Sequence, residues 1–211
     1  MKKLFKPLTL ALAALLMAGS LISCDDSASG SNKTLTPEDV YEKVENAEDL
    51  KMTIEMEITD FMTTTMTAEK DGDKSYIKAV VEMMGMSQSS ETYTEAKGDT
   101  IVTYTQDGDS WITEESSADE TVDDTSLESF KELFNSANFG EYNKETGRYE
   151  MKQDTSVTAD GTTLTEAYIE IDGNTFEIYA KIDVDESGVS MTGTMKITIE
   201  LTDVSVTLPE V

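Results

Sequence analysis

The 211-residue chain contains no histidine, one cysteine and one arginine. The lack of histidine removes the commonest general base and the commonest zinc ligand. A single cysteine cannot form an internal disulfide, so we expect the fold to be held by packing alone. The chain also lacks a Gly-x-Ser-x-Gly nucleophile elbow, a phosphate-binding loop and a dinucleotide-binding fingerprint. We therefore predict that the protein is not an enzyme and uses neither a cofactor nor a metal.

Positive charge is scarce, because 16 Lys and Arg residues stand against 43 Asp and Glu residues, a net charge of −27. A surface of this sign repels phosphates, which excludes nucleic-acid binding. It also keeps copies of the chain apart in solution, so we expect a monomer.

No apolar run reaches the ~20 residues that a membrane-spanning helix needs. The longest, residues 8–22, follows Lys2, Lys3 and Lys6, which is the layout of a secretory signal. The run ends in Leu21-Ile22-Ser23-Cys24, which closely resembles a bacterial lipobox. That resemblance implies cleavage before Cys24 and attachment of a diacylglyceryl group to its sulfur.

We therefore predict three segments: a lipoprotein signal peptide over 1–23, a flexible polar tether over 24–34, and a single domain over 35–211. Processing would leave 13 basic against 43 acidic residues, a net charge of −30. Two acyl chains, at about 0.8 kcal/mol per buried CH₂, hold a protein stably on a bilayer. We expect the acylated Cys24 to tether the domain to the extracytoplasmic face of the cell membrane. Whether the envelope has one membrane or two stays open.

Two helices are predicted in the domain. Thr36 is a good N-cap before Pro37, and an apolar stripe follows it at helical spacing: Val40, Tyr41, Val44 and Ala47. Thr125 and Glu128 form a capping box for the second helix. Its apolar stripe is Leu127, Phe130, Leu133, Phe134 and Ala137.

Most of the remaining chain alternates apolar and polar residues, which predicts half-buried β-strands. The clearest alternation runs over 50–58, 77–83, 176–184 and 189–201. Turn signals separate the strands: Asp71-Gly72, Lys97-Gly98-Asp99, Asp107-Gly108, Asp160-Gly161, Asp172-Gly173 and Ser187-Gly188. The fold class that follows is α+β, mainly β. We expect a long curved antiparallel sheet of about ten strands, an incomplete barrel, with both helices on its concave face.

Three stretches of the chain are similar to the Lol-type lipoprotein carriers and the related LppX/LprG-type lipoproteins. They are residues 98–111, which include Tyr104 and Trp111, residues 168–172 and residues 204–209. The resemblance covers roughly 36–211. It implies an incomplete barrel wrapped around helices, with a lipid or acyl chain held in an apolar cavity. It implies no catalytic residues.

Methionine is abundant, with ten residues beyond the signal peptide. Flexible thioethers fill irregular cores and also line permissive apolar pockets, and both interpretations stay open. If a cavity exists, its predicted lining is Val40, Val44, Met52, Ile54, Met56, Ile77, Val81, Met83, Phe130 and Phe134. Met83-Met84-Gly85-Met86 is a poor copper site, because neighbouring residues of a strand point to opposite faces.

Acidic hairpin tips are the remaining pattern of interest. Asp183-Val184-Asp185-Glu186-Ser187-Gly188 matches the first half of a calcium-binding loop, but Thr194 stands where the bidentate glutamate belongs. We interpret it as a turn, and weak Ca²⁺ binding there or at Asp107-Gly108-Asp109 stays open.

Two functions are therefore weighed. The first is a non-catalytic binding module for a lipid or another apolar ligand, tethered to the membrane through Cys24. The second is an envelope interaction or structural lipoprotein with a filled core, whose acidic surface meets cations or a basic partner. A cavity of several hundred Å³ between sheet and helices would favour the first.

Overall fold

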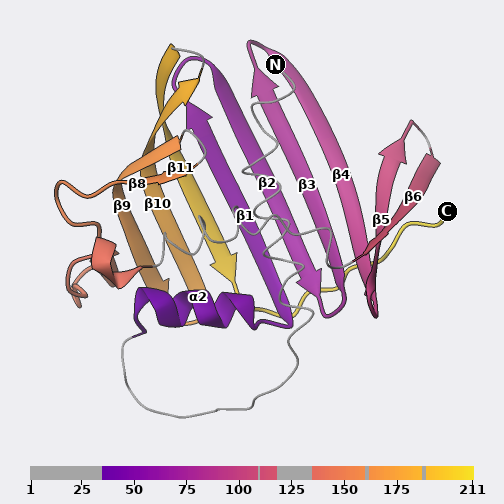
Figure 1. The fold of residues 1–211 in the computed structure, drawn as a ribbon, viewed down its shortest axis with the longest axis horizontal. Helices are drawn as coiled ribbons and strands as arrows, with labels where there is room; N and C mark the ends of the chain where they lie inside the picture. The colour runs from indigo at the N-terminus through magenta and orange to yellow at the C-terminus, as the bar shows by residue number, and fades with distance from the viewer. Residues whose placement is uncertain (1–34, 109, 118–134, 160–161, 187–188) are drawn as a thin grey trace.

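The computed structural model describes residues 35–108, 110–117, 135–159, 162–186 and 189–211. Within these ranges the chain forms one α-helix, one 3₁₀ turn and eleven strands (Figure 1). They are α2 (Pro37–Glu45), β1 (Asp49–Ile58), β2 (Met62–Asp71), β3 (Lys74–Met83), β4 (Met86–Lys97), β5 (Thr100–Asp107), β6 (Ser110–Ser117), η2 (Ser136–Asn138), β7 (Arg148–Glu150), β8 (Val157–Ala159), β9 (Thr162–Asp172), β10 (Thr175–Glu186) and β11 (Val189–Glu200).

All eleven strands belong to one open antiparallel sheet. The order is β6-β5-β4-β3-β2-β1-β11-β10-β9-β7, and β8 pairs with β9 beside this path. Sequential hairpins build both wings, and β1 joins them by pairing with β11 over Lys51–Ile58. The predicted mainly-β, antiparallel class is therefore confirmed, with eleven strands.

Helix α2 begins as the sequence predicts. Thr36 caps it, accepting from the Asp39 N–H at 3.1 Å, while Asp39 Oδ2 accepts from the Thr36 N–H at 2.7 Å. Val40, Tyr41 and Val44 are buried in the same apolar cluster as the sheet. The helix lies across one end of β9, β10, β11 and β1 (Figure 1). Among the described residues, no helix has the length and apolar character needed to cross a membrane.

The second predicted helix is not confirmed. Residues 125–134, with Phe130 and Phe134, lie outside the described residues. At its predicted end the structure differs, because Ala137 belongs to the 3₁₀ turn η2. Asn135 caps this turn by accepting from the Ala137 N–H, so a short polar side chain competes with helical hydrogen bonding. Glu38 of α2 accepts hydrogen bonds from the backbone and side chain of Ser136, which ties η2 to α2.

Tight turns account for the hairpins. Gly72, Gly98, Gly108 and Gly173 all adopt the positive φ that their turn signals predict. One glycine has a different role. A Cβ at Gly193 would lie 2.0 Å from the Glu57 carbonyl oxygen, so only glycine lets β11 approach β1 this closely.

The last residues add no strand. Residues 201–211 have no regular secondary structure, although 204–209 is one of the stretches that carries the family resemblance. They still pack on the domain, because Val206 is buried and its N–H donates to Asp71 Oδ2 at 3.0 Å.

Candidate functional site

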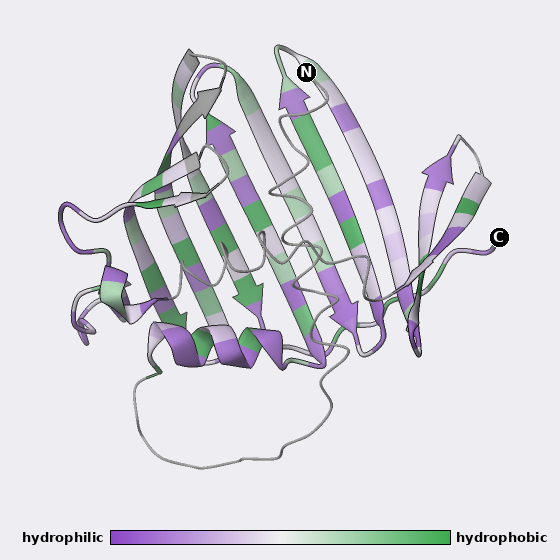
Figure 2. Cartoon of the chain, in the orientation of Figure 1, coloured by the Kyte–Doolittle hydropathy of each residue, from purple (hydrophilic) through white to green (hydrophobic). Residues whose placement is uncertain are grey.

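One face of the sheet, here called the apolar face, carries nearly all of the core. Directly paired residues of antiparallel strands share a face, so the registers define rows across the sheet. One row is Ile169, Ile178, Ile197, Ile54, Met66, Ala79 and Ser90. Apolar residues recur along β10, β11 and β1, whereas β4 has almost none (Figure 2).

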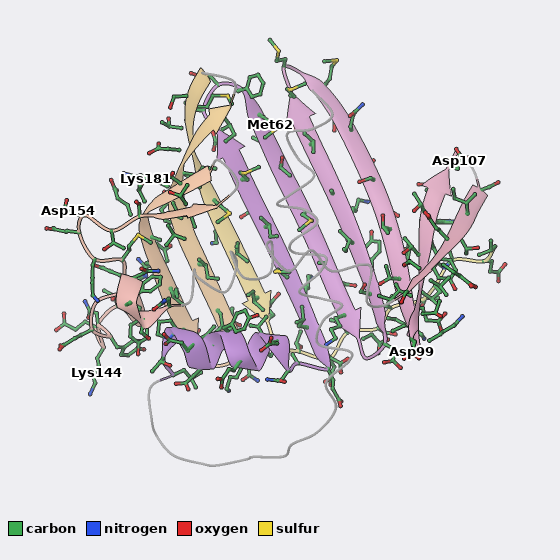
Figure 3. The ribbon with its side chains drawn as sticks, in the orientation of Figure 1. Met62, Asp99, Asp107, Lys144, Asp154 and Lys181 are labelled. Carbon is green, nitrogen blue, oxygen red and sulfur yellow. The ribbon has the colours of Figure 1, made fainter. Side chains whose placement is uncertain are left out.

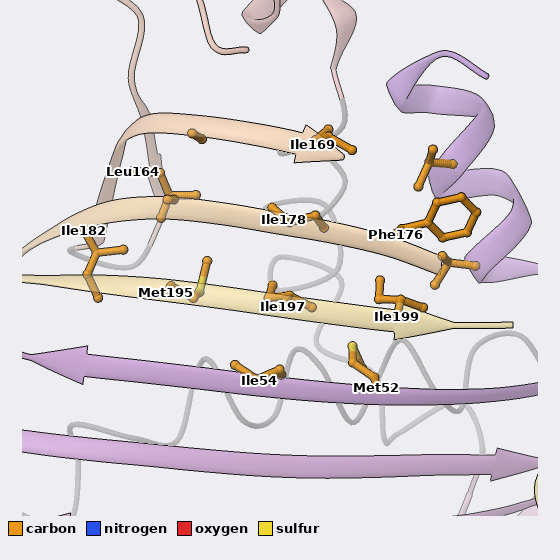
Figure 4. Packing of buried hydrophobic residues seen from close by; sticks show 14 of the residues in the cluster. Met52, Ile54, Leu164, Ile169, Phe176, Ile178, Ile182, Met195, Ile197 and Ile199 are labelled. Atoms are coloured by element: carbon orange, nitrogen blue, oxygen red, sulfur yellow. The ribbon is translucent and has the colours of Figure 1, made fainter. Parts of the chain in front are cut away.

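The apolar face is fully packed where α2 covers it. Phe176, Ile199 and Met52 are completely buried there (Figure 4). Phe176 points toward the helix, and Val40 and Val44 complete the contact as members of the same cluster. This end of the sheet is a filled core.

The apolar face is only half-buried farther along the sheet. The side chains concerned lie on β1 and β3 and pack against the edge of the core: Met56, Ile77, Ala79, Val81 and Met83. We call this set the apolar strip. Across the sheet it ends at β4, where the residues paired with Ile77, Ala79 and Val81 are Thr92, Ser90 and Gln88. The strip therefore has core on one side and polar residues on the other.

A hollow of about 460 Å³ lies at one end of the sheet, and none of the residues of the apolar strip lines it. It lies between the β1–β2 and β3–β4 turns, at the end of the sheet remote from α2; Figure 3 labels Met62, which lines it. Its apolar lining includes Phe61, Met62, Met84 and Met86. Met84 and Met86 are 80% and 63% exposed, although Met84 also adopts the positive φ that usually favours Asn or Gly.

Three carboxylates share the hollow with these apolar groups. Glu57, Asp60 and Glu82 line it, and no lysine or arginine does. Among the described residues, none of the three forms a salt bridge. The hollow is therefore apolar and negatively charged at once.

One hydroxyl on the apolar face has no hydrogen-bond partner among the described residues. It is Thr64 Oγ1, on a side chain only 7% exposed. Thr64 pairs with Met56 and Val81, so it lies within the apolar strip, two residues along β2 from Met62. An unpaired buried hydroxyl costs about 1–3 kcal/mol, which makes it an exception that needs an explanation.

A buried lysine lies near the end of β2 that is remote from the hollow. Lys70 is 3% exposed, and its Nζ donates to the Ala47 carbonyl, just after α2, at 2.5 Å. Burial lowers the pKa of Lys70, although Asp49, Glu48 and Asp73 act in the other direction. The adjacent Ser75 and Thr94 hydroxyls bond to each other. Polar groups at this end are thus satisfied, in contrast to Thr64.

The predicted site residues separate into three groups. Val40, Val44, Met52 and Ile54 are fully buried in the packed core and are not among the residues that line the hollow. Met56, Ile77, Val81 and Met83 belong to the apolar strip. Phe130, Phe134 and the acylation residue Cys24 lie outside the described residues.

Sequence reasoning missed Thr64, Phe61 and the carboxylates of the hollow. The available signal was the Thr63-Thr64-Thr65 run, which places a hydroxyl where β2 should present an apolar side chain. The Met84-Gly85 turn was missed because methionine is unusual in a two-residue turn. For metals, no group of three or more Cys, Asp or Glu side chains in the described part of the chain is placed so that it could hold a metal ion. Ser187 and Gly188 of the calcium-like loop lie outside it.

Comparisons with known proteins assign no family. No family model matches the chain, and no curated protein matches it. Among solved structures, the S-type phycobiliprotein lyase CPES from Guillardia theta aligns at 6% sequence identity with a TM-score of 0.32. The alignment covers 75% of this chain and 89% of the lyase. A likeness of this size carries no argument about this chain, whose function must be argued from its own residues.

Proposed function

We propose that the protein is a membrane-anchored extracytoplasmic lipoprotein that binds a lipid or another apolar ligand and catalyses no reaction. The anchor would be the acylated Cys24, and the domain would act as the Lol-type and LppX/LprG-type carriers that the sequence resembles. The observation that supports binding is the apolar strip, whose side chains are only half-buried.

The dimensions of the strip suit an acyl chain. Ile77 and Met83 are six residues apart on β3, or about 20 Å at the usual rise per residue. One leaflet of a bilayer core, half of its ~30 Å thickness, corresponds to about 15 Å of chain. Covering half-exposed apolar side chains contributes about 25 cal/mol per Å² removed from water. A ligand lying along β3 would gain this energy.

Blocking the strip tests the proposal. We expect the full chain carrying Cys24→Ser, which cannot be acylated, to bind a fluorescent monoacylglycerol and to retain cellular lipid in native mass spectrometry. Met56→Trp, which lies in the strip level with Thr64 and Val81, should abolish both signals. Thr65→Trp is the matched control: it pairs with Glu55 on the opposite face and is exposed, so binding should persist. Loss of binding in both variants, or in neither, would contradict the proposal.

The anchor has its own test. Cells fed an alkyne-tagged fatty acid should label the wild-type chain and leave Cys24→Ser unlabelled. Mass analysis of the mature chain should find Cys24 at its N-terminus. An unmodified thiol on a retained leader would contradict anchoring.

The filled core beneath α2 favours the second candidate function, an envelope interaction or structural lipoprotein with an acidic surface. The same variants distinguish the two. If the chain with Cys24→Ser takes up no lipid and Met56→Trp lowers only its stability, the interaction protein is the better account.

A further inference from the structure

Methionines gather at the ends of β2, β3 and β4 that border the hollow. Met62 pairs with Met83, and Met83 pairs with Met86 across the Met84-Gly85 turn. Directly paired residues share a face of the sheet, with Cβ atoms about 4.5–5.5 Å apart. The chain pattern predicted a poor copper site because neighbours on a strand diverge, whereas the register places methionines from three strands in one row. We call the row and the turn residue together the methionine cluster: Met62, Met83, Met84 and Met86.

The thioethers of this cluster are accessible to a solute. Met62, Met84 and Met86 line the hollow, and the last two are largely exposed. A methionine side chain has three rotatable bonds, so sulfur atoms that start from neighbouring backbone positions can converge on one point. This end of the sheet therefore offers several sulfur donors to one small solute.

The turn shows that core packing does not explain the cluster. Met84 has a φ of 52°, a left-handed conformation that glycine or asparagine adopts with less strain. Its side chain is mostly in solvent, so no burial offsets this cost. A strained residue that gains nothing from packing points to a role outside the core.

The carboxylates of the hollow favour a positively charged ligand. Glu57 and Glu82 both pair with Thr63, on the face opposite to the methionine row, and Asp60 lies in the β1–β2 turn. All three carboxylates line the hollow, and none of its described lining residues is a lysine or an arginine. Their combined field attracts a cation toward the thioethers without any need for the carboxylates to coordinate it.

Sulfur donors determine which cation binds. Thioethers favour soft ions such as Cu(I), whereas carboxylates and carbonyls suit Ca²⁺ and Mg²⁺, and imidazole suits Zn²⁺. The chain has no histidine, and its only cysteine is Cys24. We propose that the methionine cluster is a binding site for a soft monovalent cation, Cu(I) or the equally charged Ag(I). The carboxylates concentrate the ion at the hollow. This inference goes beyond the proposed function and does not depend on lipid binding.

Competition with a chromophoric Cu(I) chelator, in the absence of oxygen, tests the proposal. The full chain carries Cys24→Ser, so that no thiol competes for the ion, and we expect one Cu(I) per chain. The double variant Met84→Leu, Met86→Leu should weaken binding at least tenfold. Both positions are exposed and leucine is close to methionine in volume, so the fold should persist.

A matched double variant separates the cluster from methionine in general. Met151→Leu, Met191→Leu removes two half-buried thioethers that do not line the hollow, and Cu(I) affinity should stay within twofold. X-ray absorption of the Cu(I) complex should show sulfur in the coordination shell. If both double variants change the affinity equally, if neither changes it, or if the chain with Cys24→Ser binds no Cu(I), the proposal is overturned.

Charge and ion selectivity complete the test. Glu57→Gln, Glu82→Gln should weaken Cu(I) binding about threefold at low ionic strength and less at high salt, because salt screens the field. Glu114→Gln, Glu145→Gln removes the same charge from exposed residues outside the hollow and should have a smaller effect. Equal effects would overturn the role of the hollow's carboxylates. Displacement of Cu(I) by excess Ca²⁺ would mean that oxygen ligands hold the ion, which overturns the thioether site.

Discussion

Two halves of the same sheet differ sharply in how far their apolar-face side chains are buried from water. The packed half consists of β9, β10, β11 and β1 beneath α2, and its apolar-face residues, such as Ile169, Ile178 and Ile197, are almost completely buried. The open half consists of β3, β4, β5 and β6. There the same rows continue as Ala79, which is half-buried, and Ser90, which is exposed.

The pairing differs as well. Strand β1 is paired along its whole length with β2, from Asp49 to Ile58. On its β5 side, β4 is paired only over Thr92–Lys97, and β5 and β6 diverge from it (Figure 1). One continuous sheet therefore carries both a conventional core and a surface with unused apolar area. The apolar strip stays half-exposed beside this core.

Matched isoleucine deletions should show the largest contrast between the halves. Ile178→Ala removes a side chain that is 3% exposed and should cost about 2–5 kcal/mol of unfolding free energy, because a cavity remains. Ile77→Ala removes a half-buried side chain and should cost roughly half as much or less. Urea unfolding measures both. Equal losses would mean that the strip is core and that the comparison fails.

A methyl group added at Gly193 should have the next largest effect. Gly193→Ala forces β11 away from the Glu57 carbonyl and should cost about 1–3 kcal/mol. In the open half, Gly98 has no neighbour within 4 Å of an added Cβ. Gly98→Asn should cost less than about 1 kcal/mol, since Asn tolerates positive φ. Thermal denaturation of both variants measures which one loses more stability. A larger loss in Gly98→Asn than in Gly193→Ala would contradict the prediction.

The smallest effect is expected in alkaline solution. Burial, together with its hydrogen bond to Glu177, raises the pKa of Tyr168 from 10.0 to about 12. Because the folded state prefers the neutral phenol, its contribution to stability is complete below pH 10 and is lost as pH rises toward 12. Tyr168→Phe should therefore lose less stability across that range than the wild type.

Tyr93 of the open half provides the control for this titration. Burial also raises the pKa of Tyr93, but by less. Tyr93→Phe should change the alkaline profile by a smaller amount when unfolding is followed between pH 9 and 12. If Tyr168→Phe and Tyr93→Phe changed the alkaline stability profile equally, the predicted difference between the two tyrosines would be wrong.

Local signals predicted much of this architecture. The Thr36-Pro37 start of α2 and the alternation over 50–58 appear where the sequence places them, because capping and period-two patterns act over a few residues. The Asp71-Gly72 turn holds for the same reason. The end of the second predicted helix was wrong, because Asn135 caps a 3₁₀ turn there.

The candidate site was predictable only in part. Met56, Ile77, Val81 and Met83 were predicted to line a cavity; they share one half-buried apolar surface, and none of them lines the hollow. Val40 and Met52 were chosen for the same pattern, yet they are packed solid. Periodicity reports which face a side chain occupies, and it does not report what covers that face.

By itself, the sequence determined that this is an acidic, antiparallel, mainly-β domain that starts with one capped helix. Charge, turn residues and apolar–polar alternation are properties of short stretches of sequence, so they can be recognised without the fold. The tertiary structure decided which apolar residues are sealed and which remain half-exposed. It also brought three carboxylates together in the hollow between the β1–β2 and β3–β4 turns. The reason is that strand register across β1, β2 and β3, together with the position of α2 over only one end, depends on contacts between distant residues.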